Sequence, residues 1–132
     1  MLRLEIVTPE KKVVDAEVDS VTVPTLSGEV GIMAAHAPLI SALKPGVLSY
    51  SQKGNVERLA ISTGFVEVSK DLVSVLTDFA DSADDIDLQS ARLEKEEAER
   101  ELASVASSAV EETESIREKI DHANAKITVA RG

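Results

Sequence analysis

The amino-acid sequence changes character near Asp78, and this change constrains the architecture more than any other feature. Before Asp78, valine, isoleucine and leucine alternate with polar residues, and glycine or proline interrupts the pattern about every 8 to 12 residues, as is typical of short strands. After Asp78, acidic residues cluster, and a tail rich in glutamate, alanine and lysine continues without glycine or proline as far as Gly132. The sequence therefore predicts an α+β protein, with a strand-rich domain over residues 1–84 and a helical domain over residues 85–132.

The first domain is expected to be a jelly-roll-like β-sandwich of about ten short antiparallel strands, because no spacing typical of a βαβ unit occurs. Two segments, Lys53-Gly54-Asn55 and Ser69-Lys70-Asp71, predict hairpin turns, and Pro24 is expected to end a strand. Gly28 and Gly31 are expected to bracket another turn, since glycine reaches positive φ without steric cost. The strands are predicted at residues 2–7, 13–14, 18–23, 30–33, 39–43, 47–52, 56–62, 64–68 and 72–77.

The second domain is expected to be an antiparallel hairpin of two helices. The first helix is predicted from about residue 87 to about residue 103, and residues 104–109 form a poor helical segment that predicts the turn. The second helix carries apolar residues at alternating spacings of four and three, which is typical of a narrow seam between two helices. Each fully buried leucine or isoleucine contributes only about 1.5–3 kcal/mol, so a hairpin with few of them docks weakly, either as a fixed brace or as a movable element. The seam residues are Leu88, Ala91, Ala98 and Leu102 in the first helix and Ile116, Ile120, Ala123, Ile127 and Ala130 in the second.

Composition and motifs exclude several classes of function. The net charge of −10 at pH 7 disfavours nucleic acid, whose affinity comes largely from lysine and arginine contacts to phosphate, and it disfavours direct binding to anionic lipid. The chain has no cysteine, and no apolar run reaches the roughly 20 residues of a membrane span, so we expect no thiolate metal site and no membrane insertion. The two histidines, His36 and His122, lie in different predicted domains, and no motif of a catalytic nucleophile or a phosphate-binding loop occurs. We therefore expect a non-catalytic protein without a metal site.

One stretch of the chain carries a more specific pattern. Residues 27–33 read Ser-Gly-Glu-Val-Gly-Ile-Met, and residues 36–39 read His-Ala-Pro-Leu. This pattern resembles that of the epsilon subunit of bacterial and chloroplast F-type ATP synthases. In that family the region has the motif G-E-x-G-I, followed by H-x-P-L. The likeness continues in order at residues 4–9, 63–68 and 86–87, so it covers essentially the whole sequence.

The resemblance implies a non-catalytic subunit in the central stalk of a proton-transporting rotary motor. Such a subunit links the gamma subunit to the membrane c-ring and so couples ring rotation to ATP synthesis in the alpha and beta subunits. By the same resemblance, Glu29 faces the c-ring loops, whereas His36 and Ser41 face gamma. The implied location is peripheral to a membrane, on the cytoplasmic face of a bacterial cell membrane or on the stromal face of the thylakoid in a plastid.

Some members of this family bind ATP at the base of the hairpin through the motif I-D-x-x-R-A and further arginines. Here Ile86, Asp87 and Ala91 match the motif, but Ser90 stands where the arginine is expected. A triphosphate needs guanidinium groups or their equivalent, so we expect ATP binding to be weak or absent, and we expect no other cofactor. With the helices aligned on residues 127–130, the further arginines are replaced by Glu97, His122 and Lys126.

A second role in the family is inhibition of ATP hydrolysis, in which the hairpin extends into the ring of alpha and beta subunits. Its basic residues would then meet an acidic segment of beta. Residues 85–132 carry 12 acidic and 7 basic residues, and this net charge of −5 does not favour an acidic target. Inhibition is therefore expected only if the basic residues gather on one face. The candidates are Arg92, Lys95, Arg117, Lys119 and Lys126.

Two other functions stay open from the residues alone. The chain could be a free-standing β-sandwich adaptor whose hairpin binds a partner helix, and copurification with gamma and beta in fixed stoichiometry separates this alternative from the first. The chain could instead be a jelly-roll enzyme or a ligand-binding domain with a pocket around His36. In that case His36→Ala would abolish a small-molecule activity while leaving assembly of the complex intact.

Overall fold

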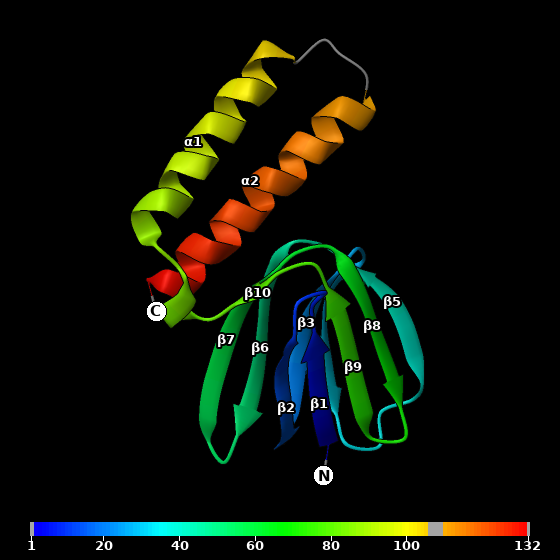
Figure 1. The fold of residues 1–132 in the computed structure, drawn as a ribbon. Helices are drawn as coiled ribbons and strands as arrows, with labels where there is room; N and C mark the ends of the chain where they lie inside the picture. Colours follow the sequence, from blue (N-terminus) through cyan, green and yellow to red (C-terminus); the bar gives the residue numbers. More distant parts are fainter. Residues whose placement is uncertain (1, 106–109, 132) are drawn as a thin grey trace.

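The computed structural model describes residues 2–105 and 110–131, which form ten β-strands, one short 3₁₀ helix and two α-helices (Figure 1). The strands come first and the helices last, so the predicted α+β fold is confirmed. Among these residues, no helix is long and apolar enough to cross a membrane. The strands are β1 (Leu2–Val7), β2 (Lys12–Val18), β3 (Ser20–Thr25), β4 (Gly28–Met33), β5 (Leu39–Leu43), β6 (Gly46–Gln52), β7 (Asn55–Ile61), β8 (Gly64–Ser69), β9 (Leu72–Thr77) and β10 (Ala80–Asp81). The helices are η1 (Ala83–Asp85), α1 (Leu88–Ser104) and α2 (Val110–Ala130).

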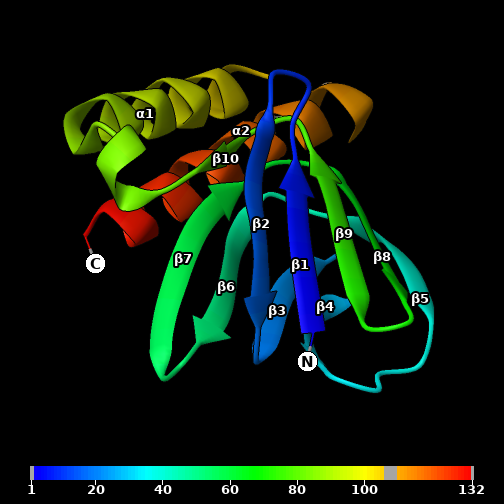
Figure 2. The ribbon, with the colours of Figure 1, turned by 60° about the horizontal axis from the view of Figure 1, so that its bottom comes forward.

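The ten strands form one sheet that curls into a nearly closed sandwich (Figures 1 and 2). Neighbouring strands follow the order β10-β7-β6-β3-β5-β8-β9-β1-β2, and β4 pairs with β3 outside this path. Most neighbouring pairs are antiparallel, as predicted, but β1 and β9 pair in parallel, with Leu4 opposite Val73. These two strands are far apart in sequence and are not joined by a tight turn, so no antiparallel direction is imposed on them.

The core of the sandwich consists of aliphatic side chains from alternate strand positions. Leu4, Ile6, Leu48, Ile61 and Val75 are fully buried and belong to one cluster. The chain has only two phenylalanines and one tyrosine, so valine, isoleucine and leucine fill this space. Because a close-packed interior resists deformation, the sandwich is a stiff support for the side chains on its outer faces.

Both predicted hairpin turns are confirmed. Lys53 and Gly54 have φ values of 50° and 83°, and Lys70 and Asp71 have φ values of 49° and 62°. These left-handed conformations are the ones that two-residue hairpin turns require, because they match the twist of the flanking strands. The second strand is longer than predicted, since residues 12–18 belong to β2, and the short strand β10 was not predicted.

The turn near Gly28 differs from the expectation. Gly28 has a φ of 116°, but it begins β4, and Gly31 lies inside that strand, so the turn is formed by residues 26–27. Pro24 does not end a strand either, because β3 continues through it. Its carbonyl oxygen accepts a hydrogen bond from the Lys44 N–H at 3.0 Å. A proline is tolerated in a strand where the ladder does not need its missing N–H.

The helical hairpin is confirmed, and α1 begins directly after Asp87. The Asp87 carboxylate accepts hydrogen bonds from the N–H groups of Gln89 and Ser90 at 3.0 and 3.2 Å, so Asp87 caps the helix. Most of the predicted turn between the helices, residues 106–109, lies outside the described residues. The seam residues that are fully buried include Ala91, Ala98, Ile116 and Ala123.

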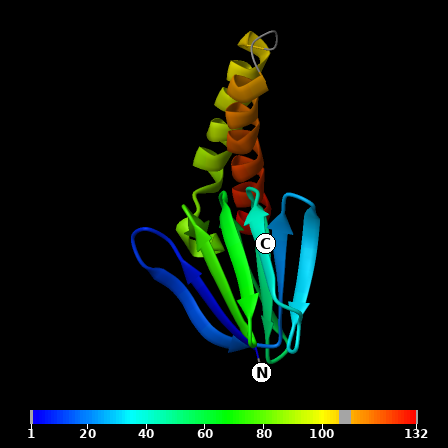
Figure 3. The ribbon, with the colours of Figure 1, turned by 90° about the vertical axis from the view of Figure 1, so that its right-hand side faces the viewer.

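The hairpin stands at one end of the sandwich and contacts it through α2 (Figures 1 and 3). Ala125 and Val129 of α2 are buried against Ala60 of β7, with Val47 and Ile86 packed at the margin. We call these five residues the docking contact. Ala125 and Val129 were not among the predicted seam residues, so the docking contact uses a different face of α2. Because its buried members are only two alanines and one valine, the docking contact buries much less apolar surface than the core of the sandwich.

Candidate functional site

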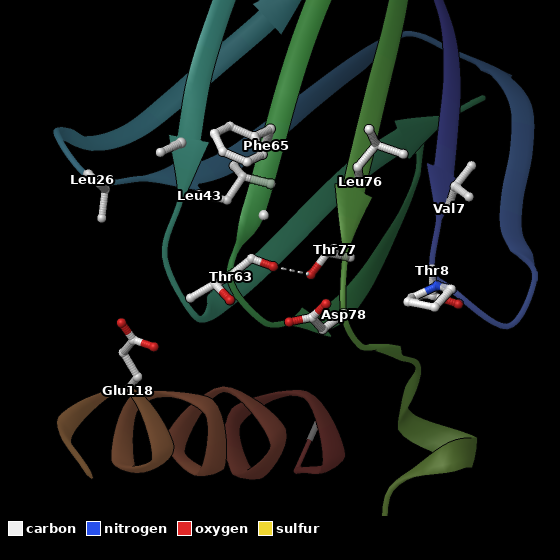
Figure 4. Close-up of a pocket in the computed structure, with 13 residues that line it drawn as sticks. Val7, Thr8, Leu26, Leu43, Thr63, Phe65, Leu76, Thr77, Asp78 and Glu118 are labelled. Atoms are coloured by element: carbon white, nitrogen blue, oxygen red, sulfur yellow. Dashed lines mark hydrogen bonds between the residues drawn. The ribbon is translucent and has the colours of Figure 1, made fainter. Parts of the chain in front are cut away.

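A line of apolar side chains crosses the outer face of the sandwich on β5, β8, β9 and β1. The strand register places Ala42 opposite Phe65, Phe65 opposite Leu76, and Leu76 opposite Val7. Paired residues of neighbouring strands point to the same side of a sheet, so these side chains form a continuous line. Figure 4 shows Phe65, Leu76 and Val7 along it. We call these four residues the apolar row.

The apolar row is open to solvent. Phe65 is 59% exposed and Leu76 is 54% exposed, while the nearby Leu26 and Ile40 are 71% and 73% exposed. A groove of about 660 Å³ runs along the row, and Glu118 of α2 lies across it from the strands (Figure 4). Large apolar side chains that gather on a surface mark a site of interaction with a protein, a membrane or a ligand.

Hydrogen bonds fix the ends of the strands that form the floor of this groove. The Thr77 hydroxyl accepts a hydrogen bond from the Ser62 N–H at 3.1 Å, and it lies 3.1 Å from the carbonyl oxygen of Thr63, as Figure 4 shows. Gly64 begins β8 here, and a Cβ at this position would collide with the backbone carbonyl of Leu76. The close approach of β8 and β9 at this end of the groove therefore depends on the glycine.

Glu29 and His36, which the sequence placed at partner interfaces, lie at opposite ends of β4. Glu29 is exposed near the beginning of the strand, and half-buried His36 lies in the loop after its end. The His36 Nδ1 atom is 2.6 Å from the carbonyl oxygen of Ala37. The Ala35 N–H donates a hydrogen bond to the Asp71 carboxylate at 2.7 Å, which ties the loop to the β8–β9 turn. The structure therefore presents these two residues on separate parts of the sandwich.

Ser41, the third predicted interface residue, points inward. It pairs with Val66, which is fully buried, and Leu43, two positions further along β5, belongs to the core. Because side chains alternate along a strand, the outward residues of β5 are Ile40 and Ala42. The resemblance implied that Ser41 faces gamma, whereas the strand register places its side chain on the inner face of β5, and Ile40 and Ala42 are the residues that β5 presents on its outer face.

Sequence reasoning missed the apolar row, although the strands carry a signal for it. In β8 and β9 the buried positions include Val66 and Val75. Phe65 and Leu76 occupy positions of the opposite parity, which point outward. Large apolar residues at outward positions of strands that become neighbours indicate a surface patch. The apolar row could not be predicted from the sequence alone, because the sequence does not show that β1 pairs with β9.

A cleft between α1 and α2 holds many of the charged residues of the hairpin. Its walls include Glu94, Glu97, Glu101, Lys119 and His122. The Lys126 Nζ atom is 2.6 Å from a carboxylate oxygen of Glu94, and the Lys119 Nζ atom is 3.6 Å from one of Glu101. Two lysines of α2 are thus neutralised by glutamates of α1. In the part of the chain that the structure describes, no group of three or more acidic, histidine or cysteine residues is arranged to hold a metal ion.

Three of the four positions that match or replace the nucleotide motif have structural roles at the base of α1. Asp87 caps the helix and accepts the Ser90 N–H. Ile86 packs at the docking contact, and Ala91 is buried within the hairpin. Helix capping and packing therefore account for Ile86, Asp87 and Ala91, and the exposed side chain of Ser90 supplies no positive charge.

The five basic residues that the sequence offered as inhibitory contacts do not share one face. Arg92 and Lys95 are three positions apart on α1 and lie on neighbouring parts of its surface. Arg117 and Lys119 are two positions apart on α2, and residues at this spacing point in different directions. Lys119 and Lys126 also turn toward α1, where they form ion pairs. In this arrangement these five candidates do not form a common basic surface.

Comparison with known proteins finds similar sequences along nearly the whole chain. Residues 1–83 match the family described as "ATP synthase, Delta/Epsilon chain, beta-sandwich domain". The chain is 42% identical over 130 residues to the ATP synthase epsilon chain of Nitratidesulfovibrio vulgaris, which covers 98% of this chain and 89% of that one. It is 47% identical over 105 residues to the ATP synthase epsilon chain of Desulforamulus reducens, which covers 80% of each chain.

A solved structure shares the fold. A chain in the cryo-EM structure of Euglena gracilis mitochondrial ATP synthase, which contains OSCP, F1 and the c-ring, superposes with a TM-score of 0.80 at 23% identity. The superposition covers 99% of this chain and 81% of that one, so the likeness extends over the sandwich and the hairpin together. At this level of identity the comparison bears on the fold alone.

Proposed function

The chain belongs to the epsilon-chain family of ATP synthases, and from this premise we propose how its surfaces serve the central stalk of the enzyme. As an epsilon chain it is a non-catalytic subunit. Its sandwich links gamma to the c-ring, so that rotation of the ring is carried through gamma to the alpha and beta subunits, which make ATP. The chain is thus a mechanical connector in proton-driven ATP synthesis.

The apolar row carries this proposal, and we assign it to the interface with gamma. A connector that transmits torque needs an interface that does not slip, and large buried side chains supply most of the binding energy of protein interfaces. Phe65 and Leu76 are of this type, and they lie on neighbouring strands above a close-packed core. Glu118 at the rim of the groove favours a basic residue on the partner at that point.

A double substitution in the apolar row tests this assignment. Phe65→Glu combined with Leu76→Glu would bury two carboxylates against an apolar partner, so we expect the yield of chain that copurifies with gamma to fall about tenfold or more. Val56→Glu combined with Leu93→Glu is the matched control. Val56 is 60% exposed and Leu93 is 54% exposed, close to the exposed fractions of the row residues, and neither belongs to the groove.

The outcome is read against circular dichroism, which establishes that each variant is folded. Loss of copurification in the first variant and retention in the control would support the assignment. Retention in both variants would contradict it. Equal loss in both folded variants would also contradict it, because the effect would then follow from added charge anywhere on the surface.

We further propose that Glu29 meets the c-ring loops and that His36 meets gamma, with Ile40 taking the place expected for Ser41. The positions of Glu29 and His36 at opposite ends of β4 support contacts with different partners. Because the chain has no cysteine, Glu29→Cys and His36→Cys each provide a unique position for cross-linking. We expect the first to cross-link to subunit c and the second to gamma, and the reverse pattern would overturn this part of the proposal.

We also propose that the hairpin binds ATP weakly or not at all. A triphosphate entering the cleft would meet the carboxylates of Glu94, Glu97 and Glu101. The nearby cations, Lys119 and Lys126, are already paired with glutamates. Like charges brought together at such distances repel, and the ion pairs would have to break before either lysine could bind phosphate.

Titration calorimetry of the full-length chain with ATP and magnesium tests this part. A dissociation constant in the millimolar range or weaker would agree with the proposal, and a micromolar constant would overturn it. Ser90→Arg combined with Glu97→Arg restores two guanidinium groups and should strengthen binding. Ser90→Lys combined with Glu97→Lys is the matched control, because it adds the same charge without the forked donor geometry that phosphate prefers.

The third part of the proposal is that the hairpin is a movable element, and that it restrains ATP hydrolysis once extension brings onto one face the basic residues that are separated in the docked arrangement. The small docking contact supports movement, and extension of the hairpin would free Lys119 and Lys126 from their ion pairs. Truncation after Ser82 leaves all ten strands in place. In the reconstituted catalytic complex we expect this truncation to raise the hydrolysis rate several-fold. An unchanged rate, with gamma still bound, would identify the hairpin as a passive brace.

The chain is part of a membrane-associated enzyme, and we propose that it lies on the cytoplasmic face of a bacterial cell membrane, or on the stromal face of the thylakoid in a plastid. Its similarity to the epsilon chains of Nitratidesulfovibrio vulgaris and Desulforamulus reducens favours the bacterial location. Fractionation of sealed vesicles of known orientation tests it. Accessibility of the chain to protease from the cytoplasmic side supports the proposal, and protection on that side would overturn it.

A further inference from the structure

His122 lies where the hairpin meets the sandwich. It projects from α2, and its Nδ1 atom is 3.4 Å from the carbonyl oxygen of Ile61 at the end of β7. Its ring stacks at an angle of 40° on the ring of Phe79, with 5.6 Å between the centroids. His122 therefore adds a hydrogen bond and a ring contact to the docking contact formed by Ala125 and Val129.

A single polar residue can matter here because the rest of the interface is small. The buried residues of the docking contact are two alanines and one valine, and such side chains contribute little when they leave water. By contrast, the hydrogen bond between His122 and Ile61 joins the sandwich directly to α2. The balance between docked and released hairpin is therefore sensitive to the gain or loss of a single hydrogen bond.

The charged groups around His122 come from three elements. From α1, the carboxylates of Glu94, Glu97 and Glu101 line the same cleft, and from α2, Lys119 and Lys126 approach it. Asp81 of β10 faces it from the sandwich. Lys126 pairs with Glu94, and Lys119 pairs with Glu101. The other two carboxylates near the ring, those of Asp81 and Glu97, take no part in these two ion pairs.

These surroundings favour the neutral imidazole in the docked state. Burial lowers the pKa of His122, and the charge of Lys126 lowers it further. The Ile61 carbonyl, Asp81 and Glu94 oppose this effect without cancelling it. A neutral ring can donate its Nδ1 proton to the Ile61 carbonyl, whereas a protonated ring would place a positive charge in a partly desolvated position beside a lysine.

We propose that His122 is a latch between the two domains, which holds the hairpin on the sandwich while its imidazole is neutral and releases the hairpin when a proton binds. In the released state the ring is hydrated and has its ordinary pKa of about 6.5. Above a pH of about 6.5 the imidazole is neutral in both states, and its contribution to docking is complete. Because the docked state has the lower pKa, this contribution is lost as the pH falls through the interval between the two values. The latch rests on the proposed movement of the hairpin and names the residue that controls it.

Distance measurement on the full-length chain tests the latch. The chain has no cysteine, so Asn55→Cys and Glu99→Cys place one spin label on the sandwich and one on the hairpin. Double electron–electron resonance at pH values between about 8 and 5.5 then reports the docked fraction. We expect the ratio of docked to released hairpin to fall as the pH decreases, by at most about tenfold per pH unit, since a single proton is bound.

Two further variants make the test specific. His122→Gln keeps a side-chain donor for the Ile61 carbonyl but cannot be protonated, so the docked ratio should lose its pH dependence. The chain has two histidines, and His36→Gln is the matched control, which should keep the full dependence. In each variant, the ratio of docked to released hairpin at low pH is compared with the ratio that the same variant shows at high pH. A substitution that strengthens or weakens docking at every pH therefore does not hide the result.

Three outcomes would overturn the proposal. The first is an interspin distance that does not change with pH in the unmodified pair. The second is a pH dependence that persists in His122→Gln, because carboxylates would then be responsible. The third is loss of the dependence in His36→Gln. As an independent readout, the imidazole resonance of His122 should titrate below the ordinary pKa in the docked chain, and titration at or above it would also contradict the latch.

Discussion

In the sandwich, Leu4, Ile6 and Leu48 are enclosed among other aliphatic side chains, whereas the buried positions of α1 are the two alanines Ala91 and Ala98. The difference has an energetic consequence, because a buried leucine or isoleucine contributes about 1.5–3 kcal/mol and alanine much less. The sandwich therefore draws its stability from its own core. The hairpin depends on a thin seam, two interhelical ion pairs and a small contact with the sandwich.

The comparison shows how one chain can contain a stiff part and a part of low stability. Stiffness suits the apolar row, which must keep its shape when torque passes through it. Low stability suits an element that changes position, since locally unstable units open at little cost in free energy. The same comparison predicts that substitutions of one chemical type have different effects in the two domains.

The largest effect is expected from truncation of a core leucine. Leu48→Ala should destabilise the sandwich by about 2–5 kcal/mol, because it leaves a cavity in a close-packed interior. Leu102→Ala, in the half-buried seam of the hairpin, should cost the hairpin about 1 kcal/mol. Tyr50 in β6 is the single tyrosine of a chain without tryptophan, so its fluorescence reports unfolding of the sandwich, while circular dichroism reports mainly the helices.

Chemical denaturation with both probes resolves the two contributions. Leu48→Ala should lower the midpoint of the tyrosine transition, and Leu102→Ala should lower the midpoint of the helical transition alone. Equal shifts of both probes in both variants would contradict the comparison, because the chain would then unfold as one cooperative unit.

A second effect comes from the glycine that lets β8 approach β9. Gly64→Ala should destabilise the sandwich by about 2–3 kcal/mol, since the new Cβ would collide with the backbone of Leu76, which cannot move as a side chain can. Gly31→Ala in β4 is the matched control, because a Cβ there meets no atom within 4 Å. Thermal unfolding, monitored by tyrosine fluorescence, gives the change in stability for both variants. Comparable shifts in the two variants would show that the close approach at Gly64 relaxes easily.

A third and smaller effect concerns the cap of α1. Asp87→Ala removes the carboxylate that accepts two helix N–H groups and should destabilise the hairpin by about 1 kcal/mol. Asp84→Ala removes an equal charge from the neighbouring 3₁₀ helix without removing this cap. The helical transition in circular dichroism should therefore shift for the first variant and stay nearly unchanged for the second. Equal shifts would assign the effect to charge near the helix and not to capping.

The alternation of apolar residues was enough to predict most strands and both hairpin turns, because that information is local to each strand. Composition likewise predicted both helices, and α1 ends one residue from the expected position. The parallel pairing of β1 with β9 could not be predicted, since it depends on contacts between the two ends of the sandwich. The strand β10 was missed because its two residues are too few to show a pattern.

The candidate sites show the same division between local and long-range information. The change of Ser90 in the nucleotide motif was visible in the sequence, and so was the thin seam of the hairpin. The apolar row was not, because it requires knowledge of which strands lie side by side. Ser41 was expected to face gamma, but its side chain points inward, because it pairs with the buried Val66. The interface role of His122 depends on contacts with Ile61 and Phe79, which are distant in sequence.

The smallest effect is expected from the ion pairs of the hairpin, and it bears on the proposed movement. Lys126 is largely covered, with 17% of its side chain exposed, and pairs with Glu94 at 2.6 Å, whereas Lys119 is 60% exposed and pairs with Glu101 at 3.6 Å. Screening by solvent should reduce the coupling energy of the exposed pair to near zero and leave about 0.5–1 kcal/mol for the covered one.

Double-mutant cycles measure both coupling energies. One cycle combines Lys126→Met with Glu94→Gln, and the other combines Lys119→Met with Glu101→Gln. The helical unfolding transition, measured by circular dichroism, gives the stability of each variant. If the covered pair shows the larger coupling, extension of the hairpin must first break this bond, and Lys126 becomes available to an acidic partner only in the extended state. If both couplings vanish, the charges of the hairpin do not hold it closed. Closure would then rest on the alanine and isoleucine seam together with the docking contact, which are the features that most clearly separate the hairpin from the sandwich.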